Sequence, residues 1–267
     1  MNALNFMVVT FAVAHVVSGY YGGYYGDNEE NDQIVGGFKA KRGDYQFLAA
    51  LLRDDEPFCG GSLITPNHVL TAAHCVDYIK QVDYGTVKVL LNTTTIRPAD
   101  DGAIHRGVKK IVHHRNYNSA TSVNDIAVVT LDSPVEGISV ISLPRIGTTL
   151  SYAGLWGTII GFGRTHKTLA EEESSGFGSN KLLESSVKVI TNSQCSAMYV
   201  DTRISSSMLC AHADGTDTCQ GDSGGPLIVH GTQVGIVSWG YGCADSRYAG
   251  VYTRLTFFYS WIKANTV

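Results

Sequence analysis

Apolar residues in this chain gather in short runs that are separated by Gly, Asn, Asp and Pro, a spacing typical of many short strands. One helix is predicted at residues 256–265, where Phe257, Phe258, Trp261 and Ile262 form an apolar face. Strands without long alternating helices favour an all-β sandwich or barrel. The predicted strands include residues 46–52, 68–72, 86–91, 126–131, 157–160, 186–190, 227–230 and 234–239.

The first residues read as a targeting segment. The apolar run at residues 6–17 is too short to span a bilayer and is followed by Ser18 and Gly19, small residues that suit signal peptidase. We therefore expect residues 1–19 to be a signal peptide and the protein to be secreted and extracellular. Residues 20–33, rich in Tyr, Gly and acidic side chains, have no apolar periodicity and predict a flexible pro-segment. The folded domain is then residues 34–267.

Composition narrows the class of protein. Hydrophobic residues make up 44% of the chain and charged residues 16%, enough apolar surface for a substantial core. The formal charge of −4 comes from the acidic residues before Ile34, where there is no Lys or Arg. The folded domain therefore has as many basic as acidic residues. A neutral domain gives no indication of a nucleic-acid or membrane partner.

Six cysteines in an exported chain predict disulfides, and their number alone leaves every pairing open. A zinc site is disfavoured because no two cysteines form a CxxC pair. Asn92 begins the chain's one N-glycosylation sequon, and the sequence leaves its occupancy open.

Three segments carry candidate chemistry. Ser223 lies in the glycine-rich turn GDSGG, where the main-chain N–H groups of Gly221 and Ser223 can converge on one oxygen, as an oxyanion hole requires. His74 ends an apolar strand beside a cysteine, and Asp125 stands just before the run at 126–131. Each would be ordinary alone: a loop serine, a structural histidine, a turn aspartate. Together they supply a nucleophile, a base and a group that orients the base.

The motifs around these residues carry a resemblance to a known family. They are IVGG at 34–37, TAAHC at 71–75, NDI at 124–126, GDSGGP at 221–226 and SWG at 238–240. With them the chain resembles the chymotrypsin family of serine proteases, and within it the trypsin-like branch, from Ile34 to Val267. The resemblance implies two antiparallel six-stranded β-barrels with a C-terminal helix, and an active site in the cleft between them.

The same resemblance implies the catalytic roles. Ser223 would be the nucleophile, His74 the general base and then the general acid, and Asp125 the group that fixes the His74 tautomer. Gly221 and Ser223 would form the oxyanion hole. It also implies three disulfides: Cys59–Cys75, Cys195–Cys210 and Cys219–Cys243.

Substrate choice is expected to depend on Asp217, which the resemblance places at the floor of the primary pocket, where a carboxylate pairs with Arg or Lys. Gly240 and Gly250 match the pocket walls and Ser238 a neighbouring position in the substrate site. Cleavage after Gln33 would free the Ile34 ammonium to pair with Asp222 and order the pocket. Because Gln33 is neutral, we expect a different protease to activate the zymogen.

The expected partners are protein or peptide substrates, the activating protease and protein inhibitors, for a protein that acts as a monomer. No metal or other cofactor is expected, since residues 91–96 lack the Glu that opens the family's calcium loop. Two alternatives remain: a protease of chymotrypsin-like or elastase-like specificity, which Asp217 disfavours, and a catalytically weak homologue that acts as a binding module.

Overall fold

A computed structural model gives the structure of the protein and describes residues 38–163, 179–213, 222–242 and 245–267. The chain divides into two compact units, Met1–Asn31 and Asp32–Val267. The first unit lies outside the described residues, as do the predicted signal peptide and pro-segment. The second unit contains all the described residues.

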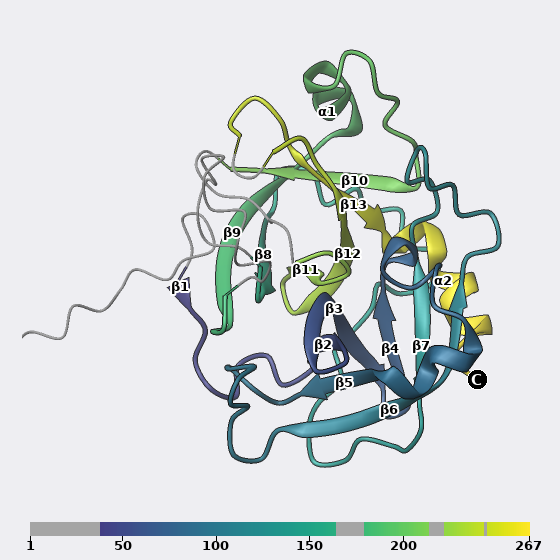
Figure 1. Ribbon diagram of the computed structural model, residues 1–267. Helices are drawn as coiled ribbons and strands as arrows, with labels where there is room; N and C mark the ends of the chain where they lie inside the picture. Colours follow the sequence, from purple (N-terminus) through teal and green to yellow (C-terminus); the bar gives the residue numbers. More distant parts are fainter. Residues whose placement is uncertain (1–37, 164–178, 214–221, 243–244) are drawn as a thin grey trace, which may run out of the picture. The chain divides into compact units, whose positions relative to one another are not determined.

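Six strands of the first half of this unit close into an antiparallel barrel (Figure 1). Its strand order is β2-β3-β4-β7-β6-β5. The inward side chains of β2, β5 and β7 are almost all buried, which explains why these runs read as apolar in the sequence. The bounds are β2 Leu48–Arg53, β3 Glu56–Thr65, β4 His68–Thr71, β5 Val87–Leu91, β6 Ile104–His113 and β7 Ala127–Leu131.

Six strands of the second half form another antiparallel ring, β9-β10-β13-β12-β11-β8, which pairing between β8 and β9 closes. The two-residue strand β1 (Phe38–Lys39) pairs with β9. The predicted fold of two six-stranded antiparallel barrels is therefore confirmed. The bounds are β8 Trp156–Gly161, β9 Leu183–Ile190, β10 Met208–His212, β11 Pro226–Val229, β12 Thr232–Trp239 and β13 Gly250–Arg254.

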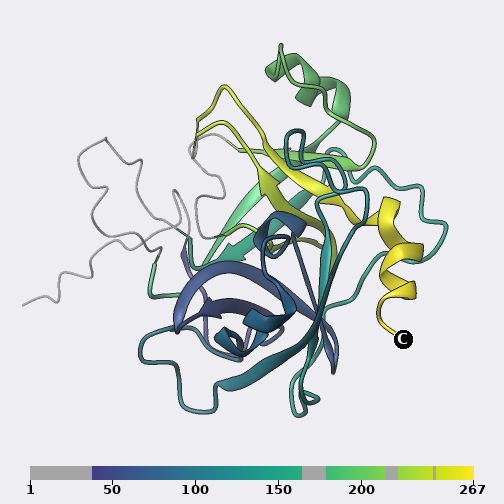
Figure 2. The ribbon, with the colours of Figure 1, turned by 45° about the vertical axis from the view of Figure 1, so that its right-hand side comes forward.

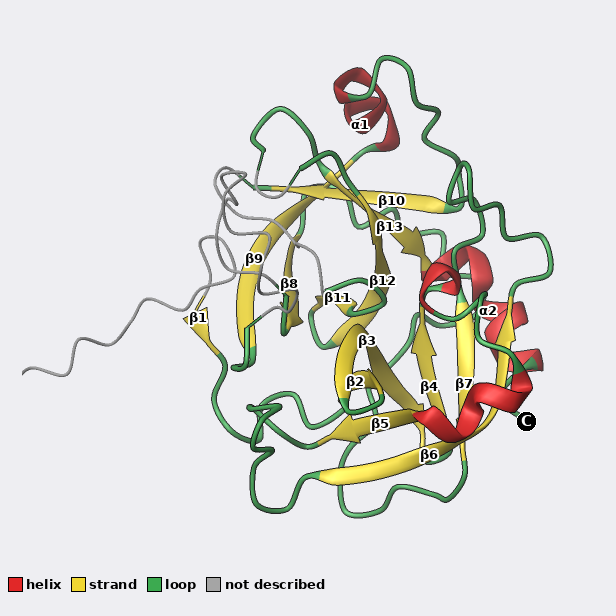
Figure 3. Cartoon of the chain, viewed as in Figure 1, coloured by secondary structure: helices red, strands yellow, loops and turns green. Residues whose placement is uncertain are grey.

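Helices lie outside the barrels (Figures 2 and 3). The predicted C-terminal helix is α2 (Leu255–Ala264), which begins one residue earlier than expected. A short helix that was not predicted, α1 (Asn192–Met198), begins with a capping box between Thr191 and Gln194. Two 3₁₀ turns, η1 (Ala73–Cys75) and η2 (Gln81–Thr86), complete the described helical segments. No helix in the described ranges is long and apolar enough to cross a membrane.

One continuous apolar cluster fills the first barrel and extends to the second barrel and α2. It contains Leu51 and Ile126 from the first barrel, Ile236 from β12, and Phe258 and Ile262 from α2. A separate cluster, with Leu209 and Tyr252, fills the second barrel. Packing within this shared cluster holds the two barrels against each other. The candidate catalytic residues lie along this contact.

Candidate active site

His74 lies on the turn η1, directly after β4. The flanking Ala73 and Cys75 are buried, and the disulfide Cys59–Cys75, with its Cα atoms 6.1 Å apart, ties the turn to β3. β4 pairs with β7 so that Thr71 faces Ala127. The chain after β4 and the chain before β7 therefore meet at one end of the barrel, which brings His74 and Asp125 together.

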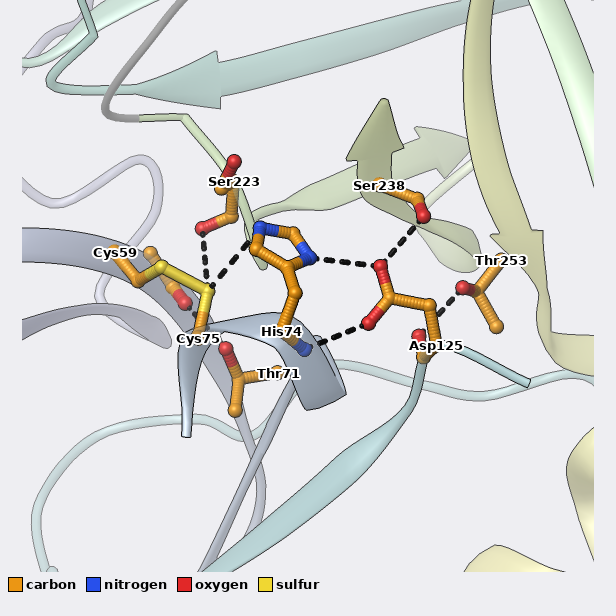
Figure 4. A network of polar contacts seen from close by, with 9 residues as sticks. Cys59, Thr71, His74, Cys75, Asp125, Ser223, Ser238 and Thr253 are labelled. Atoms are coloured by element: carbon orange, nitrogen blue, oxygen red, sulfur yellow. Dashed lines mark hydrogen bonds and ion pairs between the residues drawn. A yellow bond between two sulfur atoms is a disulfide. The ribbon is translucent and has the colours of Figure 1, made fainter. Parts of the chain in front are cut away.

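The Asp125 carboxylate is fully buried and accepts three hydrogen bonds (Figure 4). Its Oδ1 accepts from the main-chain N–H of His74 at 2.9 Å, and its Oδ2 is 2.8 Å from Nδ1 of the His74 ring. Oδ2 also accepts from the Ser238 hydroxyl at 2.6 Å. The Thr253 hydroxyl donates to the Asp125 main-chain carbonyl at 2.6 Å. With these donors fixing its position, the carboxylate holds the imidazole in one orientation.

The electrostatics of His74 follow from this contact. Burial of the imidazole by itself lowers the pKa of His74, but the hydrogen bond and negative charge of Asp125, helped by Asp77, outweigh burial and raise the pKa above its ordinary value. The imidazolium is therefore stabilised, which suits a general base.

Ser223 lies beside the His74 ring on the side opposite Asp125 (Figure 4). Its main-chain carbonyl accepts from the N–H of Gly60 at 2.8 Å, which fixes the turn against β3. Its hydroxyl points away from the ring and makes no hydrogen bond within the described part of the chain. His74 Nε2 lies 3.7 Å from the Cys75 sulfur. Catalytic hydrogen bonds are often long or misaligned without substrate.

The turn after Ser223 requires glycine. Gly224 has φ +82°, and a Cβ at this residue would overlap the Thr71 hydroxyl and the Gly60 carbonyl. The serine is therefore presented by a close contact between the two barrels that a larger residue would force apart.

Asp222 is buried, at 1% exposure, in a narrow space beside β8. The Gly163 N–H donates to its Oδ1 at 2.8 Å, and a Cβ on Gly161 or Gly163 would overlap the carboxylate. Ile34, its predicted partner in the active enzyme, lies outside the described residues.

The predicted pocket is described in part. Gly240 and Gly250 lie close together, since a Cβ on Gly240 would be 3.9 Å from the Gly250 Cα. The side chain of Ser238, a residue predicted for the substrate site, donates to Asp125. Asp217, Gly221, Cys219 and Cys243 lie outside the described residues.

An aromatic cluster that was not predicted from the sequence lies beside these glycines. Tyr199, 2% exposed, has ring-centroid distances of 5.0 Å to Trp239, 5.1 Å to Tyr241 and 5.3 Å to Tyr248, and its hydroxyl donates to the Ala249 carbonyl. The aromatic density of residues 239–248 was the available signal, but nothing in the sequence links it to Tyr199.

Cys59, His74 and Cys75 place three potential metal-ligand atoms within 4.8 Å of one another. Both sulfurs belong to the disulfide and Nδ1 faces Asp125, so these atoms are not available as a thiolate and imidazole set. The second described disulfide, Cys195–Cys210, joins α1 to β10 with Cα atoms 6.2 Å apart. Both pairs are those implied by the resemblance.

Comparison with known proteins agrees with this geometry. The family model for trypsin matches residues 34–262. A trypsin of Xenopus laevis is 37% identical over 239 residues, which cover 88% of this chain and 91% of that protein. Trypsin epsilon of Drosophila erecta is 36% identical over 233 residues, 86% of each chain, and trypsin alpha of Drosophila melanogaster is 36% identical over 248 residues, 88% and 89% of the two chains. With matches of this length, the chain belongs to the trypsin family and is a trypsin-like serine endopeptidase.

Proposed function

We propose that the protein is secreted as a zymogen and, once activated, cleaves protein or peptide substrates after Arg or Lys through His74, Asp125 and Ser223. It acts as a monomer, and its further partners are an activating protease and protein inhibitors. The observation that carries the proposal is the buried Asp125 carboxylate, which accepts from Nδ1 of His74 and leaves Nε2 directed toward Ser223.

The chemistry follows from that tautomer. With its proton on Nδ1, the imidazole has a lone pair on Nε2 and takes the Ser223 proton as Oγ attacks the scissile carbonyl. The Ser223 hydroxyl must first rotate toward the ring. The main-chain N–H groups of Gly221 and Ser223 stabilise the oxyanion. Asp125 stabilises the imidazolium, which then protonates the leaving amine, and water hydrolyses the acyl-enzyme through the same base.

Specificity for Arg or Lys rests on Asp217, six residues before the nucleophile in the sequence. A buried carboxylate in an apolar slot is costly without a cation, so it favours a basic side chain. The close approach of Gly240 and Gly250 supports this proposal, because side chains at either glycine would narrow the space between them.

Activation is proposed to depend on Asp222. Its carboxylate is nearly inaccessible and has glycines packed around it, so the charge of a new Ile34 ammonium would stabilise it there. In the uncut chain the Ile34 nitrogen is an uncharged amide. The apolar run at 6–17 and the disulfides support secretion, since disulfides persist in oxidising compartments.

The test compares the activated enzyme with Ser223→Ala and Asp217→Ser on matched peptides ending in Arg or Phe. Ser223→Ala should lose nearly all turnover and keep only the roughly 10³–10⁴-fold advantage over water that such sites retain without a triad member. Asp217→Ser should lose about 10- to 100-fold in kcat/KM on the Arg peptide, the worth of a charge-assisted hydrogen bond, and much less on the Phe peptide.

Three outcomes would contradict the proposal. A folded Ser223→Ala protein with most of the wild-type kcat would exclude the mechanism. Equal losses on both peptides would exclude Asp217 as the specificity residue. An activated wild-type enzyme without turnover would favour the binding-module alternative.

A further inference from the structure

An exposed carboxylate lies on the chain that directly follows the catalytic histidine. Asp77 comes three residues after His74, and its main-chain N–H donates to the Ala73 carbonyl at 2.9 Å. The Val76 N–H donates to the same carbonyl, so the turn that begins with η1 continues beyond Cys75. In a 3₁₀ turn, side chains three residues apart lie on the same side of the chain. The Asp77 carboxylate is therefore on the His74 side of this turn.

The charge of Asp77 has no counterion in the described part of the chain. The carboxylate makes no hydrogen bond or ion pair there. Arg53 reaches the same loop but lies over the Tyr78 ring, 5.8 Å from its centroid, and forms no ion pair with Asp77. Beyond the effects of burial and Asp125, the charge of Asp77 also helps to raise the pKa of His74. Asp77 is thus an unpaired anion within electrostatic reach of the catalytic base.

The leaving part of the substrate must pass close to this turn. In the mechanism proposed above, Nε2 of His74 gives its proton to the leaving amine, so the first residue of the leaving chain lies against this nitrogen. The Cys75 sulfur is 3.7 Å from Nε2 and 3.6 Å from the Ser223 carbonyl oxygen. Figure 4 shows the disulfide of Cys75 beside Ser223 and the His74 ring. The leaving residue therefore lies beside this disulfide, two residues along the chain from Asp77.

The proposed binding site for the other part of the substrate belongs to a different barrel. Gly240 follows β12 and Gly250 begins β13, both in the second barrel, whereas Asp77 follows β4 of the first. A basic side chain before the scissile bond would pair with Asp217. A basic side chain directly after that bond would instead meet Asp77.

We propose that Asp77 makes the enzyme prefer substrates with Lys or Arg directly after the scissile bond. The inference rests on the triad and the Arg/Lys pocket proposed above, and it narrows the substrate class to chains cut between two basic residues. The ammonium or guanidinium of the leaving residue donates to the Asp77 carboxylate. Because this carboxylate is exposed, the pair has the strength of a surface ion pair, about two- to fivefold in kcat/KM.

The test uses the activated enzyme and three peptides that share an Arg before the scissile bond and carry Lys, Gln or Glu directly after it. At low ionic strength, kcat/KM should be about two- to fivefold higher for the Lys peptide than for the Gln peptide, and lower by a similar factor for the Glu peptide. The ratio of Lys to Glu peptide is taken within each enzyme, so that a change in the catalytic base cancels. This ratio should fall in about 1 M NaCl, where exposed charges are screened.

Two variants change the charge of Asp77, and a third is the matched control. Asp77→Asn should remove the preference, and Asp77→Lys should reverse it. Glu136→Gln also removes one exposed negative charge. Its neighbour Val135 donates to the Pro66 carbonyl, just before β4, so the control lies at the opposite end of that strand from Asp77. Glu136→Gln should keep the wild-type ratio.

Equal rates on the Lys and Glu peptides in wild type, or an unchanged ratio in folded Asp77→Asn, would overturn the inference. An equal change in Glu136→Gln would also overturn it, because net charge rather than position would then be responsible. If the Asp77 variants fail to fold, the salt dependence of the wild-type ratio decides the matter.

The same peptides separate this inference from the proposed function. Cleavage after Arg without any preference for the next residue removes this inference alone. Failure on all three peptides, with turnover of a matched Phe peptide, removes the proposed pocket specificity itself.

Discussion

Replacing Asp125 with Asn tests whether this carboxylate sets the tautomer of His74. The two carboxylate oxygens accept from three donors: the His74 main-chain N–H, Nδ1 of the His74 ring and the Ser238 hydroxyl. The main-chain N–H can only donate, so the amide oxygen of Asn should take the place of Oδ1. The NH₂ group then faces Nδ1, while the Ser238 hydroxyl can rotate to accept from it.

This arrangement reverses the tautomer of the His74 imidazole. Nδ1 must now accept a hydrogen bond, so the ring proton moves to Nε2, which can no longer take a proton from Ser223. In the triads of this family the equivalent change lowers kcat by about 10⁴, and we expect the same order here. That factor corresponds to about 5 kcal/mol of lost transition-state stabilisation.

The pH dependence gives an independent readout. The Asp125 hydrogen bond and charge hold the pKa of His74 above its ordinary value against the effect of burial. Without the charge, burial remains and the pKa should fall below that value. The acid limb of kcat/KM should therefore begin at a lower pH in Asp125→Asn than in wild type.

The assay is the pH profile of kcat/KM on an arginine peptide, with active-site titration and a thermal melt to check folding. Asp125→Asn keeps the main-chain carbonyl that accepts from Thr253, so the fold should persist. Activity within about tenfold of wild type near neutral pH would refute the tautomer argument. An unmoved acid limb would show that Asp125 is not what raises the His74 pKa.

Three further changes test activation, the serine turn and a half-buried histidine. Gln33→Arg should let the zymogen activate itself, seen as a new N terminus at Ile34, whereas the wild-type chain incubated alone should stay inactive. Gly224→Ala should lower the free energy of unfolding in urea by about 3 kcal/mol, because the new methyl overlaps Thr71 at a positive φ. Burial against Phe258 lowers the pKa of His114, so the unfolded chain takes up a proton first and stability should fall as pH drops below about 6.5. His114→Gln should flatten that fall, and an unchanged urea midpoint between mildly acidic and neutral pH would contradict it.

The strands found from the sequence are those whose buried side chains give a clear apolar run. β12 (Thr232–Trp239) and β7 (Ala127–Leu131) are buried along most of their length and were predicted within two residues. β6 (Ile104–His113) was missed because its residues are half-buried or exposed and include several cations. β3 was missed because Pro57, Gly60 and Gly61 interrupt it, although its glycines let other strands approach closely.

The candidate site, too, could be predicted only in part from the sequence. The motifs around His74, Asp125 and Ser223 were visible in the sequence because each is local. Their contacts were not, because the Ser238 hydroxyl reaches Asp125 across 113 residues and Thr253 reaches it across 128. The capping box of Thr191 and Gln194 was a readable helix start that the sequence analysis did not use. The disulfide pairs came only from the resemblance, since cysteine number alone does not fix them.

The hydrogen bonds that reach Asp125 from the second barrel have a consequence for biosynthesis. Ser238 in β12 and Thr253 in β13 are synthesised 113 and 128 residues after Asp125, so Asp125 cannot make either contact until they follow. Contacts so distant in sequence form late in folding. A nascent or half-folded chain therefore lacks an oriented base even when Ser223 has been made, and it should be unable to digest neighbouring proteins while it folds. This safeguard disappears only when both barrels are complete.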